Sequence, residues 1–476
     1  MKQQISTQQS AFSPSTLALG LRRGTQLFVL LLVAGLAAQA QKPAKKQTSS
    51  AKQSAAQAGT AVPHNSAPAG PVVLRGAKLL TITHGVIEDG VLVMENGKIT
   101  AVGKAGSVSI PKGAKIEDVR GMTVYPGLID SETNLGLTEI SAEKMTNDLV
   151  ETSDEIMPHM HVADAFHAES SLIPVTRYNG ITNAIVTPGS DDTLPGQDAF
   201  IQLAGRNANE MLLIRDNALP MNFSGGQRRN ESFEHAKYPQ TREGMAAQLR
   251  QTFIDAQAYK KKWDDYNASK SSGNDKDKKD EPKTDLKLAA LVPYLAGQKP
   301  VIVSADESND VETAYGIAKE FGFKIVLDGV THASAIVDEI ASWHVPVIFG
   351  SIYDEPHDNE RYDAVYSLPG ELAKRGVKVI FASHDSHNAR NLPYAAGYAV
   401  GFGLPYDEAL KGLTLYPAEL WGVDKDLGSL DVGKTANVVV ANGDPLDVKT
   451  DVKQVYIQGQ PIPMVTKQTI LRDQYQ

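Results

Sequence analysis

A dense group of ionisable and polar side chains directly follows an apolar run at residues 377–382. Its members are His384, Asp385, Ser386, His387 and Asn388. Imidazole and carboxylate groups are frequent proton carriers in enzymes, and both also bind divalent metals. Because the group has more polar side chains than the end of a buried strand needs, we predict that it lines a pocket. His384 and Asp385 are candidate catalytic residues there, and His387 is a candidate pocket residue.

A second group of ionisable side chains contains His159 and His161, with Asp164 and His167 nearby. On a strand the first two would share a face, as metal ligands often do. However, Pro158 precedes them and residues 162–170 favour a helix, so we interpret the segment as a loop that enters a helix. The two imidazoles would then point in different directions. We therefore expect a polar rim here and not a metal site.

Composition limits the classes of protein and site. The chain has 476 residues, of which 42% are hydrophobic and 22% charged, so it can bury a large core. Its formal net charge is -9, and no basic patch stands out, so nucleic acid is not expected as a partner. The absence of cysteine excludes disulfides, thiolate metal sites and cysteine nucleophiles.

Residues 1–40 have the three parts of a secretory signal peptide. Arg22 and Arg23 form a basic flank, residues 27–38 carry no charge, and Ala-Gln-Ala at residues 38–40 matches a cleavage pattern. The apolar run is shorter than the ~20 residues that span a bilayer; an uncleaved amphipathic anchor is the alternative. We expect a periplasmic or extracellular mature protein without stable membrane insertion. The paired arginines leave both the general secretory and the twin-arginine route open.

Two segments have the composition of disordered chain. Residues 41–70 are rich in Ala, Ser, Gln, Lys and Pro, which bury too little apolar surface to offset their ordering entropy, so we predict a linker. Residues 268–283 mix lysines with acids and predict a solvated, disordered charged insertion.

Strand-rich sequence at both ends of the mature chain brackets a middle in which strands and helices alternate. Residues 71–130 and 424–476 predict one discontinuous β-domain. Within residues 131–423, apolar β-runs alternate with helices, which predicts βαβ units with parallel strands. The length fits a (β/α)8 barrel. A doubly wound open sheet is the alternative, although no glycine-rich phosphate loop follows the first strand of the middle region.

A series of short motifs carries a resemblance to a known family. They are residues 124–130 (VYPGLID), 178–184 (YNGITNA), 187–190 with 196–197, 391–397, 414–418, 428–434 and 442–446. Each motif alone is modest, but their order across about residues 72–460 is specific. Together they resemble the amidohydrolase superfamily, and in particular its imidazolonepropionase-like sub-group.

The resemblance implies an α/β fold in which a TIM-like (β/α)8 barrel is flanked by a small β-sandwich built from both chain ends. It implies a divalent metal, zinc in the family, at the C-terminal ends of the barrel strands. Such a metal lowers the pKa of a bound water to about 7 and polarises the scissile carbonyl. The implied activity is hydrolysis of cyclic or other non-peptide C–N (amide) bonds in a small molecule. Family members often pair, so a homo-oligomer is a further expectation.

The sequence departs from the family at the metal ligands near the start of the barrel and on its middle strands. After Asp130, the two histidine positions of the family's His-x-His motif hold Glu132 and Asn134. A family histidine on a middle strand is replaced by Ser304. The next strand carries Asp328 and a glycine where the family often has another histidine.

The last barrel strand departs as well. The position of the family's aspartate, a ligand and base, falls on His384, and Asp385 follows one residue later. A shift of one residue turns a strand side chain to the other face, so Asp385 replaces that aspartate only if the strand bulges.

These departures predict a degenerate site without a zinc centre of the family type. Loss of the zinc is the favoured interpretation; the alternative is an oxygen-rich site for Mg, Ca or Mn, with Glu132, Asn134 and Asp385 as candidate ligands. The candidate catalytic residues are Glu132, His384 and Asp385. The candidate pocket residues are Asn134, Gln197, Ser304, Asp328 and His387.

Two functions from different classes follow. The first is an exported hydrolase of C–N bonds other than peptide bonds, using a remodelled metal or an acid/base pair such as Glu132 with His384 or Asp385. The second is a non-catalytic relative, a binding or scaffold protein that keeps the barrel and the pocket. Fold alone does not choose between them, because function depends on the site.

Overall fold

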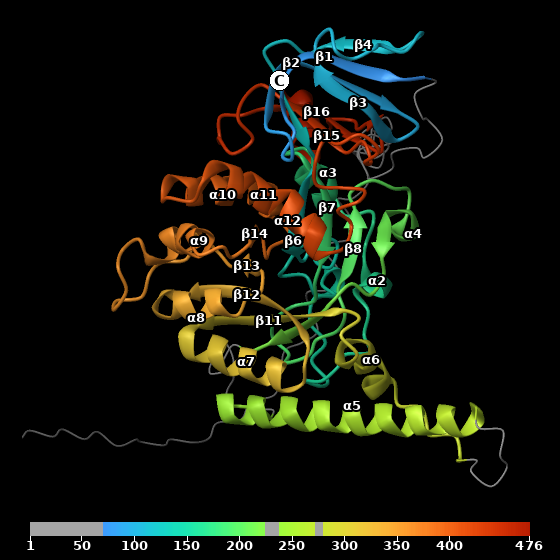
Figure 1. The fold of residues 1–476 in the computed structure, drawn as a ribbon, viewed down its shortest axis with the longest axis vertical. Helices are drawn as coiled ribbons and strands as arrows, with labels where there is room; N and C mark the ends of the chain where they lie inside the picture. The colour runs from blue at the N-terminus through green and yellow to red at the C-terminus, as the bar shows by residue number, and fades with distance from the viewer. Residues whose placement is uncertain (1–69, 224–237, 272–278) are drawn as a thin grey trace, which may run out of the picture. The chain divides into compact units, whose positions relative to one another are not determined.

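The computed structural model describes residues 70–223, 238–271 and 279–476 (Figure 1). The predicted signal peptide and all but the last residue of the predicted linker lie outside the described residues. Among the helices of the described ranges, none combines the length and the apolar character needed to cross a membrane.

Strands from both ends of the described chain pair in one sheet, with the order β17-β16-β15-β5-β1-β2-β3 and β4 paired to β1. β15 (Val438–Ala441) lies antiparallel to β5 (Thr123–Pro126), so the C-terminal strands join the N-terminal ones directly (Figure 1). A sandwich of two β-layers stays a prediction. The other strands are β1 (Val72–Leu80), β2 (Val86–Glu95), β3 (Lys98–Lys104), β4 (Lys115–Asp118), β16 (Val452–Ile457) and β17 (Gln460–Pro461).

The β2–β3 hairpin shows how the sequence determines this sheet. Asn96 and Gly97 have φ values of 52° and 78°, the left-handed backbone that a two-residue turn of type I′ requires. Along β2, Leu92 and Met94 belong to one buried cluster, and Val91 and Val93 belong to another on the opposite face of the strand. Apolar side chains on both faces explain why both sides of this strand are covered.

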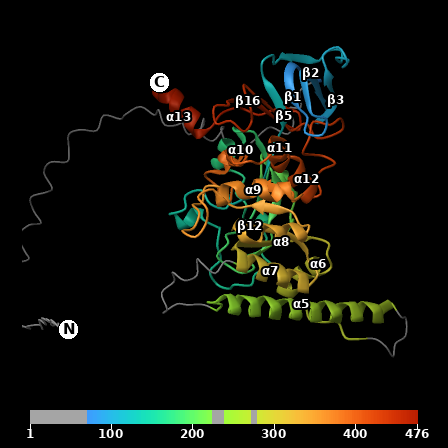
Figure 2. The same ribbon diagram turned by 60° about the vertical axis from the view of Figure 1, so that its left-hand side comes forward.

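The middle of the chain contains a five-stranded sheet, β10-β11-β12-β13-β14, in which every pairing is parallel. Helices connect the strands from β11 onward, as predicted, and α7 and α9 contact β12 (Figure 2). The strands are β10 (Leu219–Asn222), β11 (Pro300–Glu307), β12 (Lys324–His332), β13 (Val347–Phe349) and β14 (Val379–Phe381). The helices between and after them are α7 (Ser308–Glu320), α8 (Val337–Ser342), α9 (Ala364–Lys374) and α10 (Leu392–Gly401).

A separate four-stranded sheet is mixed. β6 (Leu128–Thr133) and β7 (Ile181–Val186) are parallel, but β8 (Ala199–Gln202) and β9 (Leu212–Ile214) continue the sheet antiparallel. The cause is the connection between β7 and β8, where residues 187–198 contain no helix. A parallel neighbour needs a longer crossover connection, usually through a helix. The eight parallel strands of a barrel are therefore not confirmed, and a closed barrel stays a prediction.

The two sheets share a core and are bonded at two borders. One buried cluster takes Ile129 from β6, Ile185 from β7, Ile302 from β11 and Ile380 from β14. At one border the His384 N–H donates to the Glu132 carbonyl at 2.9 Å. At the other border, the N–H of Asp198 donates to the Ala218 carbonyl at 3.2 Å, and the Ala218 N–H donates to the Asp198 carboxylate at 2.6 Å.

The Asp198 carboxylate makes the stability of this border depend on pH. Burial raises the pKa of Asp198 to about 7, although the Ala218 N–H favours the charged form. A raised carboxyl pKa stabilises the folded protein at low pH, and this contribution is lost as pH rises from about 4 to about 7. We expect Asp198→Asn to remove this loss, so urea unfolding should show the variant gaining on the order of 3 kcal/mol relative to wild type over that range. A constant difference between the two proteins across the range would contradict the assignment.

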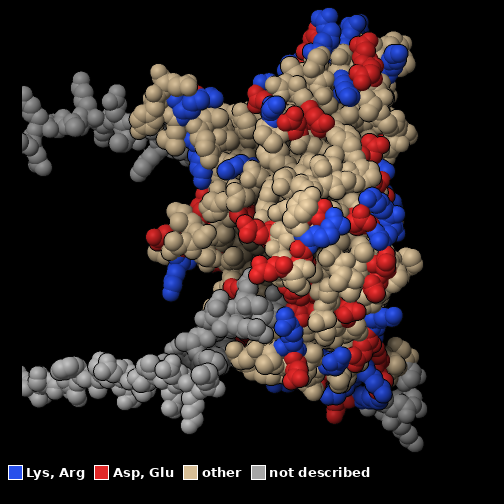
Figure 3. All heavy atoms as spheres, turned by 90° about the vertical axis from the view of Figure 1, so that its left-hand side faces the viewer, with Lys and Arg blue, Asp and Glu red and all other residues tan. Residues whose placement is uncertain are grey.

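The long helix α5 (Arg242–Ser271) corrects one prediction. It continues through residues 268–271, so the first part of the predicted disordered insertion is helical, while residues 272–278 lie outside the described part. On the face shown in Figure 3, basic and acidic side chains are interspersed. The remaining helices are η1 (Lys144–Thr146), α2 (Val162–Ala165), α3 (Leu172–Arg177), α4 (Ala208–Met211), α6 (Leu286–Leu295), η4 (Ser334–Ile336), η5 (Ala389–Asn391), α11 (Tyr406–Leu413), α12 (Leu415–Leu420) and α13 (Lys467–Tyr475).

Candidate functional site

A cavity of about 310 Å³ lies at the carboxyl ends of strands from both sheets. β6 contributes one wall and β11 and β12 another, while the loops after β13 and β14 complete it. Five residues singled out from the sequence line this cavity together, although they come from four separate segments. They are Glu132, Asn134, Ser304, Asp328 and His384.

His384 reaches the cavity because the backbone turns sharply after β14. Its φ is 51°, in the left-handed region that a non-glycine residue rarely adopts. Such a conformation costs about 1–3 kcal/mol and is concentrated at functional sites. The N–H of His384 donates to the Glu132 carbonyl at 2.9 Å, which holds the turn against β6.

Three ionisable side chains meet in this cavity. His384 Nε2 lies 2.9 Å from Asp328 Oδ1 and 3.9 Å from Glu132 Oε2. Side-chain exposure is 26% for His384, 14% for Glu132 and 6% for Asp328, so water screens their charges weakly. This group can exchange protons with a bound molecule, because an imidazole and two carboxylates are within reach of one another.

The surroundings shift the pKa values of Glu132 and His384 strongly. Burial, and then repulsion from Asp328, raise the pKa of Glu132 well above its usual value. Burial lowers the pKa of His384, but the Asp328, Glu132 and Asp130 carboxylates outweigh it and raise that pKa to about 10. At neutral pH His384 is therefore a cation bonded to Asp328, while the raised pKa of Glu132 disfavours its charged form. Displaced pKa values of this kind in a cavity are typical of functional sites.

Two buried atoms of the group have no hydrogen-bond partner in the described chain: Glu132 Oε2 and His384 Nδ1. An unpaired buried polar atom costs about 1–3 kcal/mol, so native proteins keep few of them. Here both belong to residues that line the cavity, so a bound molecule or ion is the natural partner for each.

Asp306 is a member of the cavity that the sequence analysis missed. It lines the cavity, and burial followed by repulsion from Asp328 raises its pKa. A signal was available, because Asp306 lies two residues after Ser304 and alternate residues of a strand share a face. The other lining carboxylates that the analysis missed are Asp191 and Asp354.

Three predicted site residues lie outside the lining of this cavity. The Asp385 carboxylate instead accepts the N–H groups of His387 and Asn388, at 2.6 and 3.2 Å, and so closes the turn before η5. His387 Nδ1 faces Ser386 Oγ at 3.1 Å. The left-handed turn directs His384, and not these two neighbours, into the cavity.

Gln197 is the third predicted residue outside the lining. It is buried, its side-chain amide donates to the Pro158 carbonyl at 2.9 Å, and it accepts the Tyr294 hydroxyl at 2.6 Å. Its hydrogen bonds therefore hold the segment that contains His159 and His161. That segment is a loop that enters α2, as predicted, although α2 is only four residues long and His161 pairs with Asp216 at 2.7 Å.

Hydrogen bonds between Asp130 and Ser383 connect two of the segments that form the site. Burial raises the pKa of Asp130 to about 7, against the opposing effect of hydrogen bonds from Ser383. The Ser383 hydroxyl donates to Asp130 Oδ2 at 2.6 Å, and its N–H donates to Oδ1 at 2.9 Å. These bonds join β6 to the segment that carries His384.

We expect Ser383→Ala to lower the free energy of unfolding by about 1–3 kcal/mol, because it leaves a buried Asp130 oxygen without its hydroxyl partner. Chemical denaturation should show a larger loss at pH 8, where Asp130 is mostly ionised, than at a pH below the Asp130 pKa of about 7. Ser342→Ala, which removes an exposed hydroxyl bonded to the Glu339 carbonyl, is the control and should change little. An equal loss in the two variants would contradict a supporting role for Ser383.

The residues present fit a divalent metal, but not the paired histidines of the resembled family. Ligand atoms of Glu132, Asp328 and His384 all lie within 4.8 Å of one another. One imidazole and two carboxylates form an oxygen-rich donor set, and the unpaired Glu132 Oε2 is available to a cation. Of the three candidate ligands from the sequence, Glu132 belongs to this group. Asn134 donates its amide to the Thr187 carbonyl, and Asp385 lies elsewhere.

Comparisons with known proteins agree with this architecture. The model of the Amidohydrolase family matches residues 356–462. Amidohydrolase tasK of Hapsidospora irregularis is 27% identical over 388 residues, which cover 78% of this chain. The match covers 39% of that relative, so this chain corresponds to less than half of its length. A dihydroorotase from Syntrophus aciditrophicus (strain SB) is 33% identical over 64 residues, 13% of this chain and 15% of the relative.

Solved structures extend the likeness to the fold. An amidohydrolase from Thermotoga maritima MSB8 superposes with a TM-score of 0.73 and 27% identity, over 82% of this chain and 99% of that one. A second amidohydrolase structure has a TM-score of 0.51 at 16% identity, over 83% of this chain and 99% of that one, and is similar in fold alone. The family model, the curated relative and the fold agree, and each shows that the chain is similar to members of the amidohydrolase superfamily.

Proposed function

We propose that this protein hydrolyses the C–N bond of an amide, cyclic or otherwise non-peptide, in a small molecule held in the cavity at Glu132. The observation that carries the proposal is the group formed by Glu132, Asp328 and His384. The pKa values of Glu132 and His384 are displaced, and each of these two residues has a buried polar atom without a hydrogen-bond partner in the described chain. The similarity to the amidohydrolase superfamily supports hydrolase-like chemistry. The proposal includes a closed barrel as the scaffold, which the core shared by the two sheets supports.

The mechanism follows from where protons are held. Asp328 bonds His384 Nε2 and keeps the imidazole charged, so Nδ1–H is the donor left free for a substrate carbonyl oxygen. A fixed positive donor stabilises the oxyanion that develops when water attacks the carbonyl carbon. In its ionised form Glu132 takes the proton of that water, and its raised pKa lets it return the proton to the leaving nitrogen. A divalent ion held by the same three residues would require a neutral His384, and it would take the place of the imidazolium charge by supplying Lewis-acid activation of the carbonyl and the water.

Turnover on a substrate panel tests this function. The protein comprising residues 41–476 is incubated with hydantoins, imidazolones and N-acyl amino acids, with chelator or with added Mg²⁺, Mn²⁺ or Zn²⁺. Mass spectrometry follows the ring-opened or cleaved products. We expect turnover that is lost in Asp328→Asn, because His384 then loses the carboxylate that keeps it charged. Absence of turnover under every condition, with one of the compounds bound in calorimetry, would overturn the hydrolase in favour of the binding protein.

Export to the periplasm or the exterior is also a proposal, and the residue pattern of positions 1–40 supports it. The same applies to the small molecule as partner and to pairing of two copies of the chain.

A further inference from the structure

We propose that His332, His357 and Glu360 form a second divalent-metal site, of the zinc class, outside the candidate active site. It is one of two groups of at least three ligand-capable residues found in the described chain, and its ligand atoms all lie within 4.8 Å of one another. None of the three lines the cavity at Glu132. The inference therefore does not depend on the proposed function.

The geometry brings two imidazoles and a carboxylate to one point. His332 is the last residue of β12, and its Nδ1 lies 2.9 Å from Glu360 Oε2. The His332 and His357 rings are stacked, with their centres 3.8 Å apart and their planes 13° apart. The side chains of His332 and Glu360 are only 10% and 11% exposed, so both are held in position by their surroundings.

Glu307 is the candidate fourth ligand. It ends β11 and lies opposite His332 in the register of β11 and β12. Its Oε1 lies 3.6 Å from His357 Nδ1. Glu307, His332, His357 and Glu360 line a separate cavity of about 500 Å³, which leaves room for an ion. Arg361 also lines this cavity. Its guanidinium donates two hydrogen bonds to the Asp363 carboxylate, at 3.0 and 2.7 Å, so its positive charge is paired with Asp363 and not with the acids of the group.

The donor set indicates the class of metal. Zinc in proteins is bound by histidine nitrogens and by carboxylate oxygens, usually four in a tetrahedron when the site is structural. Two imidazoles with one or two carboxylates match this set, whereas Mg and Ca prefer oxygen ligands alone. The group at Glu132 has one imidazole and two carboxylates, so the two sites should differ in their preference among metals.

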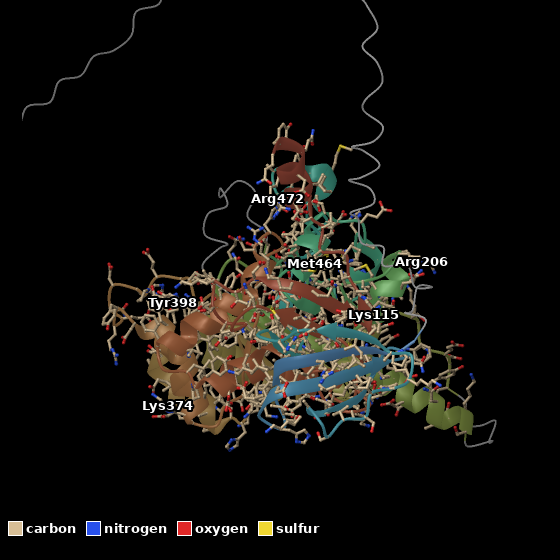
Figure 4. All side chains as sticks on the ribbon, turned by 90° about the horizontal axis from the view of Figure 1, so that it is seen from above. Lys115, Arg206, Lys374, Tyr398, Met464 and Arg472 are labelled. Atoms are coloured by element: carbon tan, nitrogen blue, oxygen red, sulfur yellow. The ribbon has the colours of Figure 1, made fainter. Side chains whose placement is uncertain are left out.

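The position of the site gives it a consequence for the fold. His357 and Glu360 belong to the loop between β13 and α9, whose earlier residues Ser351 and Asp354 line the cavity at Glu132. The same loop packs Tyr353 against Tyr398 of α10, with ring centres 6.3 Å apart; Figure 4 labels Tyr398. A metal bound to His332, His357 and Glu360 would fasten this loop to the end of β12. It would thereby position one wall of the candidate active site.

Zinc binding by the protein comprising residues 41–476 tests the inference. The probe is Zn²⁺ alone, measured by equilibrium dialysis with elemental analysis, and Co²⁺ absorbance reports on the coordination. The measurements are made in Asp328→Asn as well as wild type, because that substitution disables the other group. We expect one equivalent in the Asp328→Asn background, with a tetrahedral Co²⁺ band. His357→Ala and Glu360→Gln should weaken this binding at least ~100-fold, beyond what the loss of a supporting residue costs.

The matched control is His167→Ala, which removes an exposed histidine bonded to Asp148 at 2.8 Å. It should leave zinc binding unchanged. Glu360→Gln keeps the size of the side chain, so it tests the site even if His357→Ala fails to fold. If Asp328→Asn binds no zinc, or if Glu360→Gln binds it as tightly as its parent, the group is a hydrogen-bonded cluster only and the inference is wrong.

Discussion

Glu132→Gln is expected to lower kcat by about 10²–10⁴-fold, the contribution of general acid–base catalysis, while raising Tm. Glutamine has nearly the shape of glutamic acid but cannot exchange a proton with water or a leaving nitrogen. Burial and the neighbouring Asp328 make the charged form of Glu132 costly, as the raised pKa shows. Removing that charge should therefore stabilise the fold at neutral pH. Steady-state kinetics and thermal unfolding of the same preparations measure both effects.

The matched control for this prediction is Asp198→Asn. Asp198 is also a buried carboxyl whose pKa is raised by burial, but it does not line the cavity. The Asp198→Asn variant should gain stability at neutral pH and keep wild-type turnover. This result would separate the effect of removing a buried charge from the effect of removing a catalytic group. Wild-type kcat in Glu132→Gln would contradict the role assigned to Glu132.

His384→Ala is expected to have the largest effect on stability, with a loss of about 3 kcal/mol at pH 7, because removal of one partner strands a buried charge. The loss lies at the lower end of the usual range, because the side chain of His384 is 26% exposed and water screens part of its charge. Without His384, Asp328 loses its bonded imidazole and Glu132 loses a nearby positive charge. Turnover should be lost as well. Urea unfolding in the presence of chelator measures the change without a contribution from metal.

The pH dependence of this loss identifies its cause. The folded pKa of His384 is about 10, above the value of 6.5 for a free histidine. A raised histidine pKa contributes stability that is full below the unfolded pKa and is lost as pH rises through the folded pKa. The gap between wild type and His384→Ala should therefore narrow between pH 7 and pH 10. A gap that stays constant would assign the loss to packing.

Substitutions that tolerate the backbone of His384 provide a second control. Its φ of 51° is strained for alanine but not for glycine. His384→Gly should therefore be less destabilised than His384→Ala, although both lack the imidazole. His384→Asn, which also accepts this backbone, should retain the turn without the positive charge.

The organisation of this chain could be predicted where local pattern determines it. The Asn96-Gly97 turn, the apolar strands from β11 to β14 and the helices that separate them follow from residue type and periodicity. The meeting of Glu132, Ser304, Asp328 and His384 could also be predicted, because each follows a motif or strand with a known place in the resembled family.

Features that depend on tertiary structure could not be predicted in this way. The choice of His384 over Asp385 depends on one left-handed residue, which no rule for an ideal strand anticipates. The antiparallel β7–β8 pairing depends on the path of residues 187–198, which connect the two strands. The position of Gln197 depends on its hydrogen bonds with Pro158 and Tyr294, which belong to other segments.

The group at His332 shows the same limit more strongly. His332 lies far in sequence from His357 and Glu360, so no spacing rule connects them. They meet because the loop after β13 folds back onto the end of β12, where His357 stacks on His332. Only the folded arrangement makes this candidate metal site visible.

The most direct test of the central claim is product analysis in isotopically labelled water. Hydrolysis at the Glu132 cavity breaks a C–N bond and places one solvent oxygen in the new carboxylate. For the substrate found in the panel, we expect wild-type protein to yield an acid that carries one labelled oxygen, and Glu132→Gln to yield at least ~100-fold less of this acid in the same time. Equal labelled product from the two proteins, or a product without the label, would contradict hydrolysis by this site.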